Sequence, residues 1–223
     1  MNFLLIGGII AGILQIVGYI YYLNDDKIEP NPITWLMFAY GTAILTLLEW
    51  DAKATLPELI LPTVCAVLAI VVAYKCWIKS KIQNGNYWPK EWWPEDKGER
   101  YSFLLDIFIT IAYIVVWLFA SYALLTLEQR EFAVLIFLFL SNLSTFPSFY
   151  PIIVSTYHNP EHEYWVPWFI WGLAYIQLGF ITYFTHGAFW HPLMFYPVSN
   201  AVMHIAVGVL SLNLKRVGIR ITV

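Results

Sequence analysis

Residues 27–40 read KIEPNPITWLMFAY, an acidic turn with two prolines that leads directly into an apolar, aromatic run. The same order of features returns at residues 159–175, NPEHEYWVPWFIWGLAY. Long apolar runs are typical of transmembrane helices, because a bilayer core about 30 Å thick needs about 20 helical residues. Each of the two stretches therefore predicts a short loop followed by a membrane-spanning helix.

The rest of the chain has the same character. Of its 223 residues 60% are hydrophobic and 12% are charged, whereas soluble domains have about 25% charged residues. The apolar runs cover about 3–23, 33–49, 57–78, 102–126, 131–155, 164–185 and 190–213. The first run has no basic segment before it and no cleavage site, so we expect a retained helix. The sequence predicts an all-α integral membrane protein with seven transmembrane helices.

The two quoted stretches belong to a longer internal repeat. A shift of 133 residues places Trp35 on Trp168 and Gly18 on Pro151, and a shift of 135 places Cys65 on Asn200. We expect a first three-helix repeat at 1–78, a cytoplasmic loop and linker helix at 79–130, and a second repeat with a short tail at 131–223. An odd linker makes the repeats parallel, an arrangement known among transporters, in which the substrate binds between the repeats.

The basic residues predict the orientation in the membrane, since Lys and Arg are enriched in cytoplasmic loops. Ten of the twelve fall on the side of the C-terminus, and only Lys53 and Arg130 fall on the other. We therefore expect an outside N-terminus and a cytoplasmic C-terminus. A net charge of −3 gives no indication of nucleic-acid binding.

Several side chains are candidates for a binding site because they are polar or aromatic within apolar runs. Gln15, Asn142 and Asn200 either bond a neighbouring helix or line a pathway. Trp168 and Trp171 share one helical face and either belong to an interfacial Trp belt or stack on a ligand. Pro147 and Pro151 bend their helix. His204 either lines the pathway or is a satisfied core residue, and Asp106 lies too near a helix end to be a strong candidate.

The order of three helices, a linker helix and three helices resembles the SWEET and PQ-loop transporters, and the PnuC-type vitamin transporters share this plan. The stretches that carry the resemblance are LQIVGYIYYL with TFPSFYPIIV, PNPITWLMF with VPWFIWGLAY, and LPTVCAV with YPVSNAV. Neither repeat has an intact Pro-Gln dipeptide.

The resemblance implies roles for particular residues. In SWEET proteins a polar residue of the third and seventh helices binds sugar, which corresponds to Cys65 and Asn200. PnuC-type proteins stack a W-x-x-W pair on a ring, which corresponds to Trp168 and Trp171, with Trp35 as the counterpart in the first repeat. We place Gln15 and Ser148 in the same cavity. Hinge prolines of the family correspond to Pro32, Pro147, Pro151 and Pro167, with Gly18 in place of a fifth.

We therefore expect a SWEET/PQ-loop-like transporter that moves a small neutral solute, a sugar or a vitamin-like compound, down its gradient. The alternative is a non-transporting scaffold or accessory subunit of a larger membrane complex. We expect no enzyme activity, no cofactor and no metal site, because the sequence contains no catalytic or ATP-binding motif, and the histidines lack a convergent third ligand. A retinal protein is excluded, since the last apolar run has no lysine. The expected partners are the solute and the bilayer, and a homo-oligomer or a larger membrane complex is left open.

Overall fold

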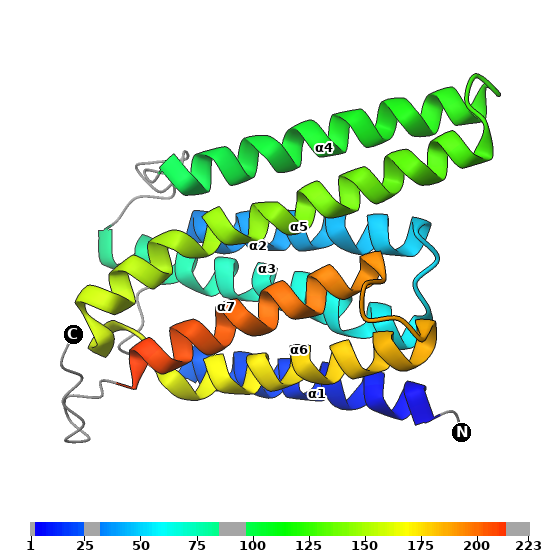
Figure 1. Ribbon diagram of the computed structural model, residues 1–223. Coiled ribbons are helices and arrows are strands. Elements are labelled where there is room, and N and C mark those ends of the chain that lie inside the picture. Colours follow the sequence, from blue (N-terminus) through cyan, green and yellow to red (C-terminus); the bar gives the residue numbers. More distant parts are fainter. Residues whose placement is uncertain (1–2, 25–31, 85–96, 213–223) are drawn as a thin grey trace, which may run out of the picture.

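The structure is a computed structural model that describes residues 3–24, 32–84 and 97–212 (Figure 1). The described residues form helices joined by turns. The α-helices are α1 (Phe3–Asn24), α2 (Pro32–Asp51), α3 (Leu56–Asn84), α4 (Lys97–Ser121), α5 (Leu127–His158), α6 (Trp165–His186) and α7 (Phe195–Ser211). Two short 3₁₀ helices, η1 (Pro160–His162) and η2 (Pro192–Met194), precede α6 and α7.

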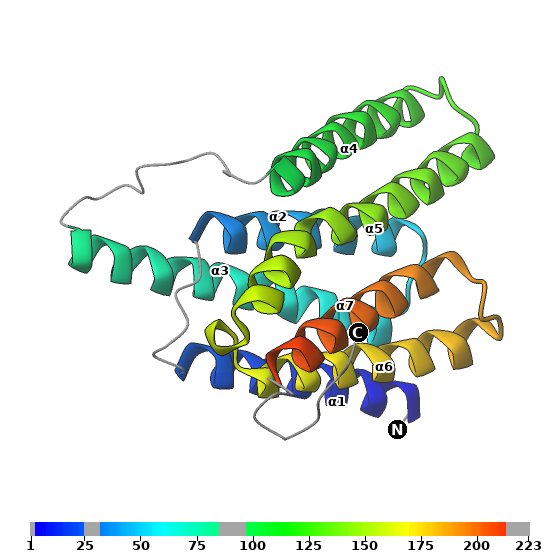
Figure 2. The same ribbon diagram turned by 60° about the vertical axis from the view of Figure 1, so that its left-hand side comes forward.

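The predicted membrane class agrees with the helices observed. Six of them are long and apolar enough to cross a bilayer, namely α1, α3, α4, α5, α6 and the η2–α7 segment. The helix α2 is not one of the six, but its 20 residues make about 30 Å of helix. It lies alongside the others in both views (Figures 1 and 2). The chain is a multi-pass membrane protein, and a seventh span at α2 stays a prediction.

The helices run back and forth between two ends of one bundle (Figure 1). We call the end that holds the turns at 52–55, 122–126 and 187–191 the Lys53 end, and the opposite end the Trp35 end. α1, α3, α5 and α7 start at the Lys53 end, whereas α2, α4 and α6 start at the Trp35 end. Corresponding helices of the two predicted repeats therefore run in the same direction.

Each helix has a limited set of neighbours. α3 packs against α1 and α2, and α7 packs against α5 and α6. The two groups meet where α1 contacts α6 and where α2 contacts α5. α4 packs mainly on α5 and lies at the edge of the bundle in both views (Figures 1 and 2).

Glycines allow the closest of these approaches. A Cβ on Gly8 would lie 2.8 Å from the Cα atom of Pro57, and one on Gly12 would lie 2.8 Å from the Ile60 side chain. Glycine therefore brings α1 next to α3, as small residues do at interfaces between transmembrane helices.

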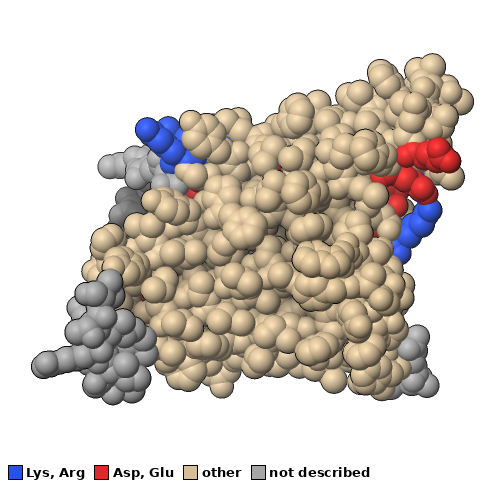
Figure 3. All heavy atoms as spheres, in the orientation of Figure 1, with Lys and Arg blue, Asp and Glu red and all other residues tan. Residues whose placement is uncertain are grey.

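The surface fits a bilayer. On the face drawn in Figure 3, the charged side chains gather at the two ends of the helices and leave an uncharged band between them. Many large apolar side chains of the helices are exposed, among them Ile13, Phe108 and Leu173. Exposure of this kind is expected where lipid, not water, surrounds the helices.

Candidate functional site: two adjoining cavities between the helix groups

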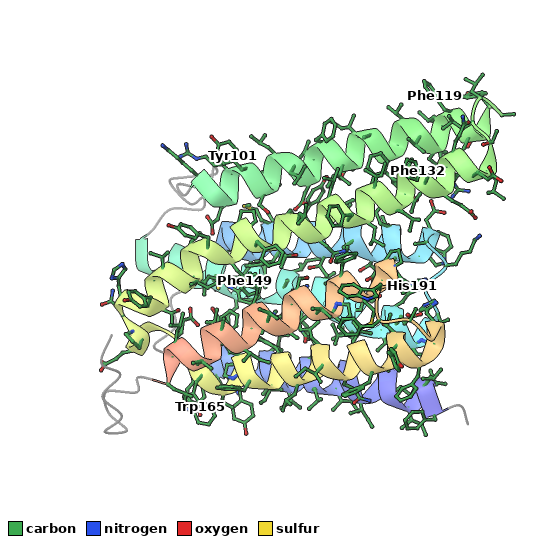
Figure 4. All side chains as sticks on the ribbon, viewed as in Figure 1. Tyr101, Phe119, Phe132, Phe149, Trp165 and His191 are labelled. Carbon is green, nitrogen blue, oxygen red and sulfur yellow. The ribbon has the colours of Figure 1, made fainter. Side chains whose placement is uncertain are left out.

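Aromatic side chains from both helix groups enclose a cavity of about 40 Å³. The α1–α3 group contributes Tyr19, Trp35, Phe38, Thr42 and Cys65. The other group contributes Phe149, Trp168, Trp171, Tyr175, Asn200 and His204. We call this space the aromatic cavity. Figure 4 labels Phe149 within the bundle, between α5 and α7, whereas the labelled Trp165 lies at its outside.

Trp171 is the central ring of the aromatic cavity. Its ring centroid lies 4.9 Å from that of Tyr19 and 5.2 Å from that of Trp168. Its Nε1 donates a hydrogen bond to the backbone carbonyl of Gln15 over 3.2 Å. The side chains of Trp168 and Trp171 are 2% and 1% exposed. These two residues therefore lie inside the bundle and do not form an interfacial Trp belt.

Gly18 makes room for this indole on α1. A Cβ on Gly18 would lie 2.6 Å from Cδ1 of Trp171, and closer still to Nε1. Because real side-chain contacts do not reach such distances, Gly18 has a packing reason to be glycine that is independent of any hinge.

Cys65 lies at the middle of a hydrogen-bonded group. The Tyr19 hydroxyl is 3.4 Å from the Cys65 sulfur, and the Tyr175 hydroxyl is 3.7 Å from it. The hydroxyls of Tyr175 and Tyr196 are 3.2 Å apart. The thiol of α3 is thus linked to the tyrosines of α6 and α7.

His204 and Asn200 form the wall of the aromatic cavity on α7. His204 Nδ1 lies 2.7 Å from the backbone carbonyl of Asn200. A carbonyl oxygen can only accept, so Nδ1 donates and Nε2 of the neutral ring is left as an acceptor. The imidazole packs between aromatic rings, with centroids 4.9 Å from Tyr175 and 5.0 Å from Phe149.

A second cavity, of about 60 Å³, lies next to the first. We call it the polar cavity, because its lining includes Asp106, Ser141, Ser144 and Ser148. The Ser144 hydroxyl lies 2.9 Å from Asp106 Oδ1 and 2.7 Å from the Ser141 carbonyl, and its single proton can go to one of them. The Ser102 hydroxyl donates to the Ser144 carbonyl over 2.9 Å. These bonds join α4 to α5.

The two cavities share part of their lining. Phe38, Thr42, Phe149 and Asn200 border both of them. The aromatic cavity and the polar cavity therefore meet at these four side chains, which come from α2, α5 and α7.

The structure brings most of the predicted site residues together. Trp35, Cys65, Trp168, Trp171 and Asn200 line the aromatic cavity, and Ser148 lines the polar cavity with Asn200. Gln15 is 1% exposed and lies beside the aromatic cavity; its Oε1 atom has no partner among the described residues. Asn142 is the exception, because it borders neither cavity and its Nδ2 donates to Leu138 of its own helix.

The candidate hinge residues occupy defined positions. Pro147 and Pro151 lie inside α5, which is helical from end to end. Pro32 is the first residue of α2, and Pro167 lies in the first turn of α6, where a missing N–H costs no helical bond. Whether any of them acts as a hinge stays a prediction.

Sequence reasoning underrated Asp106. It assigned this carboxylate to a helix end, whereas Asp106 is 6% exposed and borders the polar cavity. A usable signal exists in the sequence, because Ser141, Ser144 and Ser148 are spaced by three and four residues. That spacing puts them on one helical face, the face of α5 that borders the polar cavity.

Ion pairs join the two helix groups at the Lys53 end. Asp51 pairs with Arg130, and Lys53 pairs with Glu131. Glu58 Oε1 lies 3.0 Å from His186 Nε2, and the His186 and His191 rings stack with centroids 3.8 Å apart. Burial, and then the neighbouring His186, lower the pKa of His191 below its usual value of 6.5.

We compared the chain with protein-family models, with curated proteins and with solved structures, and none of them matches it.

Proposed function

We propose that this protein is a membrane transporter that moves a small solute, a sugar or a ring-containing vitamin-like compound, through the space between α1–α3 and α5–α7. The observation that carries the proposal is the aromatic cavity, to which both helix groups contribute. Ligand sites of this kind combine apolar and aromatic walls with a few placed polar groups. Trp35 and Trp171, with ring centroids 6.3 Å apart, supply flat faces, and Asn200 supplies a polar group.

The neighbour pattern of the helices supports a parallel repeat. Exchanging α1, α2 and α3 for α5, α6 and α7 turns the α1–α3 and α2–α3 contacts into α5–α7 and α6–α7 contacts, which are present. The same exchange turns the α1–α6 contact into the α5–α2 contact, also present. The paired positions Cys65 and Asn200 both border the aromatic cavity. A solute that binds between such repeats is exposed to alternate sides when one repeat rocks against the other.

The ion pairs at the Lys53 end fit this mechanism. Each of them links a residue at 51–58 to one at 130–186, so each crosses from the first helix group to the second. Rocking that opens the cavity toward the Lys53 end has to separate these partners. With the orientation proposed from the basic residues, the Lys53 end faces outward, and these contacts hold the two helix groups together on that side.

The test is solute binding followed by uptake. A panel of sugars and vitamin-like ring compounds is screened for compounds that raise the thermal unfolding midpoint of the purified protein, and each such compound is offered to proteoliposomes. We expect at least one of them to enter the vesicles down its concentration gradient, and we expect analogues of that compound to inhibit its uptake. If no compound stabilises the protein or enters the vesicles, the transporter proposal fails and a scaffold or accessory-subunit role takes its place.

A further inference from the structure

The polar cavity holds a buried carboxylate without a basic partner. Asp106 is 6% exposed, and among the described residues that line either cavity there is no Lys or Arg. An ionised carboxylate at membrane depth is unfavourable unless a positive charge or several donors compensate it. Among the described residues, the hydrogen-bond partner of this carboxylate is the Ser144 hydroxyl, whose single proton the nearby Ser141 carbonyl can also accept.

Two other polar side chains of the cavity, Asn200 and Ser148, have oxygen acceptors that are available. Asn200, itself 6% exposed, donates through Nδ2 to the Tyr196 carbonyl. Its Oδ1 atom has no partner among the described residues, and the side chain borders both cavities. The Ser148 hydroxyl donates to the Thr145 carbonyl, so its oxygen lone pairs are available. A cavity that offers oxygen acceptors and few donors favours a ligand that is itself a donor or a cation.

The aromatic cavity adds a second attraction for positive charge. The faces of Trp, Tyr and Phe rings attract cations electrostatically, most strongly where water is excluded. The rings of Tyr19, Trp35 and Trp171 lie within 4.9–6.3 Å of one another, centroid to centroid, and are almost fully buried. Asn200 borders both cavities, so a cation bound at Asn200 lies beside the cavity of the carboxylate and beside that of the rings.

We infer that the two adjoining cavities bind a monovalent positive charge at their shared wall, held by Asp106 and the Oδ1 atom of Asn200 and faced by the aromatic rings. The charge comes either from a cationic group of the solute or from an alkali ion that accompanies it. This inference rests on the proposed transport function, and it departs from the sequence-based expectation of a neutral solute where the charge belongs to the solute itself. A divalent metal ion fits less well, because no cluster of three His, Cys, Asp or Glu ligands occurs among the described residues.

The competing explanation is structural. A protonated Asp106 that does no more than tie α4 to α5 through Ser144 needs no ligand. It predicts that cations have no specific effect and that Asp106→Asn, which keeps the shape and the hydrogen bond, behaves as wild type.

The experiment is a titration of the full-length protein in detergent, followed by intrinsic Trp fluorescence. Sodium chloride and tetramethylammonium chloride are each titrated against N-methylglucamine chloride at constant ionic strength. We expect a saturable response to at least one probe, because Trp171 and Trp35 border the site. A response to sodium identifies an accompanying ion, and a response to tetramethylammonium identifies a charge carried by the solute.

Three variants make the result specific. Asp106→Asn should weaken the response about 10- to 100-fold, the usual effect of losing a charged hydrogen-bonding partner. Asn200→Asp adds a carboxylate to the cavity and should raise the affinity for the cation. Glu128→Gln removes an exposed carboxylate of the first turn of α5 and should leave that affinity unchanged.

Two results would overturn the inference: no saturable response in the wild type, or equal affinities in wild type, Asp106→Asn and Asn200→Asp. If Asp106→Asn does not fold, Asn200→Asp decides, since unchanged affinity there contradicts the inference. If no cation binds but a solute is transported, the inference is wrong and the transporter proposal stands. If a cation binds but no solute is transported, the cation site stands and the transporter proposal is wrong.

Discussion

Gly18 and Trp171 form the tightest pairing at the candidate site. The indole lies where a Cβ of residue 18 would be, and its Nε1 bonds the Gln15 carbonyl on the same helix. The position of Trp171 in the aromatic cavity therefore depends on the absence of a side chain on α1.

Gly18→Ala should consequently displace Trp171. We expect overpacking of this kind to cost about 1–3 kcal/mol and to lower the thermal unfolding midpoint. Gly179→Ala is the matched control, because its Cβ would have its nearest neighbour at 3.8 Å, an ordinary contact; it should be neutral or slightly stabilising, since Ala favours helix more than Gly. Equal midpoints for the two variants would contradict the packing role of Gly18.

Asn200 and Asn142 are two buried amides with different surroundings, and they should respond differently to replacement. Asn200→Leu removes the polar group shared by both cavities, so the affinity for solute should fall about 5- to 150-fold, the effect of about 1–3 kcal/mol. Asn142→Leu should leave the affinity unchanged, since Asn142 borders neither cavity. Both affinities are measured by titrating the solute found in the screen. Similar losses in both variants would show that Asn200 acts only through the fold.

The helices themselves follow from the apolar runs, but their ends do not. The run at 102–126 corresponds to α4 (Lys97–Ser121), and the run at 131–155 corresponds to α5 (Leu127–His158). Helices continue past the bilayer core into charged sequence, where apolar content gives no signal. The start of α5 was readable another way, from the capping box that Thr126 and Gln129 form, a pattern visible in the letters TLEQ.

Which face of a helix points inward was harder to predict, for a physical reason. Lipid and the bundle interior are both apolar, so hydrophobic periodicity separates them poorly. The spacing of Trp168 and Trp171 places both on one face, but a belt and a buried pair have the same spacing. The internal repeat predicted several residues that do lie together in the structure. Asp106 and the tyrosines around Cys65 had no counterpart in the repeat and were left out of the predicted site.

The turn between α6 and α7 should make stability depend on pH. The pKa of His191 in the folded protein is lowered by burial and by the stacked His186. At a pH between this lowered pKa and the pKa of the unfolded chain, the imidazole is protonated in the unfolded chain but not in the folded protein. The free energy of unfolding therefore falls as the pH drops below about 6.5 and stops falling, for this group, at the lower folded pKa. Protonation of the ring nitrogen Nδ1 would also remove the acceptor of the Leu193 N–H.

The check is the thermal unfolding midpoint at pH 7.5 and pH 5.5, for wild type and for His191→Asn. Wild type should lose more stability on acidification than the variant does. An equal or larger loss in His191→Asn would show that other groups account for the pH dependence.

The orientation of the whole bundle in the membrane is a prediction from charge. The Asp51–Arg130 and Lys53–Glu131 ion pairs lie at the Lys53 end, and the sequence-based topology assigns ten of the twelve Lys and Arg residues to the opposite side. By the positive-inside rule we propose that the Trp35 end is cytoplasmic.

Cysteine labelling tests this orientation. Glu128 is exposed at the Lys53 end and Lys97 is exposed at the start of α4 on the opposite side, while the native Cys65 and Cys76 are each 8% exposed. In intact cells an impermeant thiol reagent should label Glu128→Cys readily and Lys97→Cys only after permeabilisation. The reverse pattern would invert the topology and place the C-terminus outside.

The most direct test of solute binding between the helix groups is the uptake by proteoliposomes that contain Trp171→Ala, measured with the solute identified in the screen. Trp190→Ala is the matched control, because that indole is 85% exposed in the turn before α7. We predict that Trp171→Ala lowers the affinity for solute by roughly tenfold or more, since stacking and buried aromatic contacts are worth about 1.5 kcal/mol or more, and that Trp190→Ala transports as wild type does. Wild-type uptake and affinity in a folded Trp171→Ala protein would contradict the assignment of the aromatic cavity as the transport site.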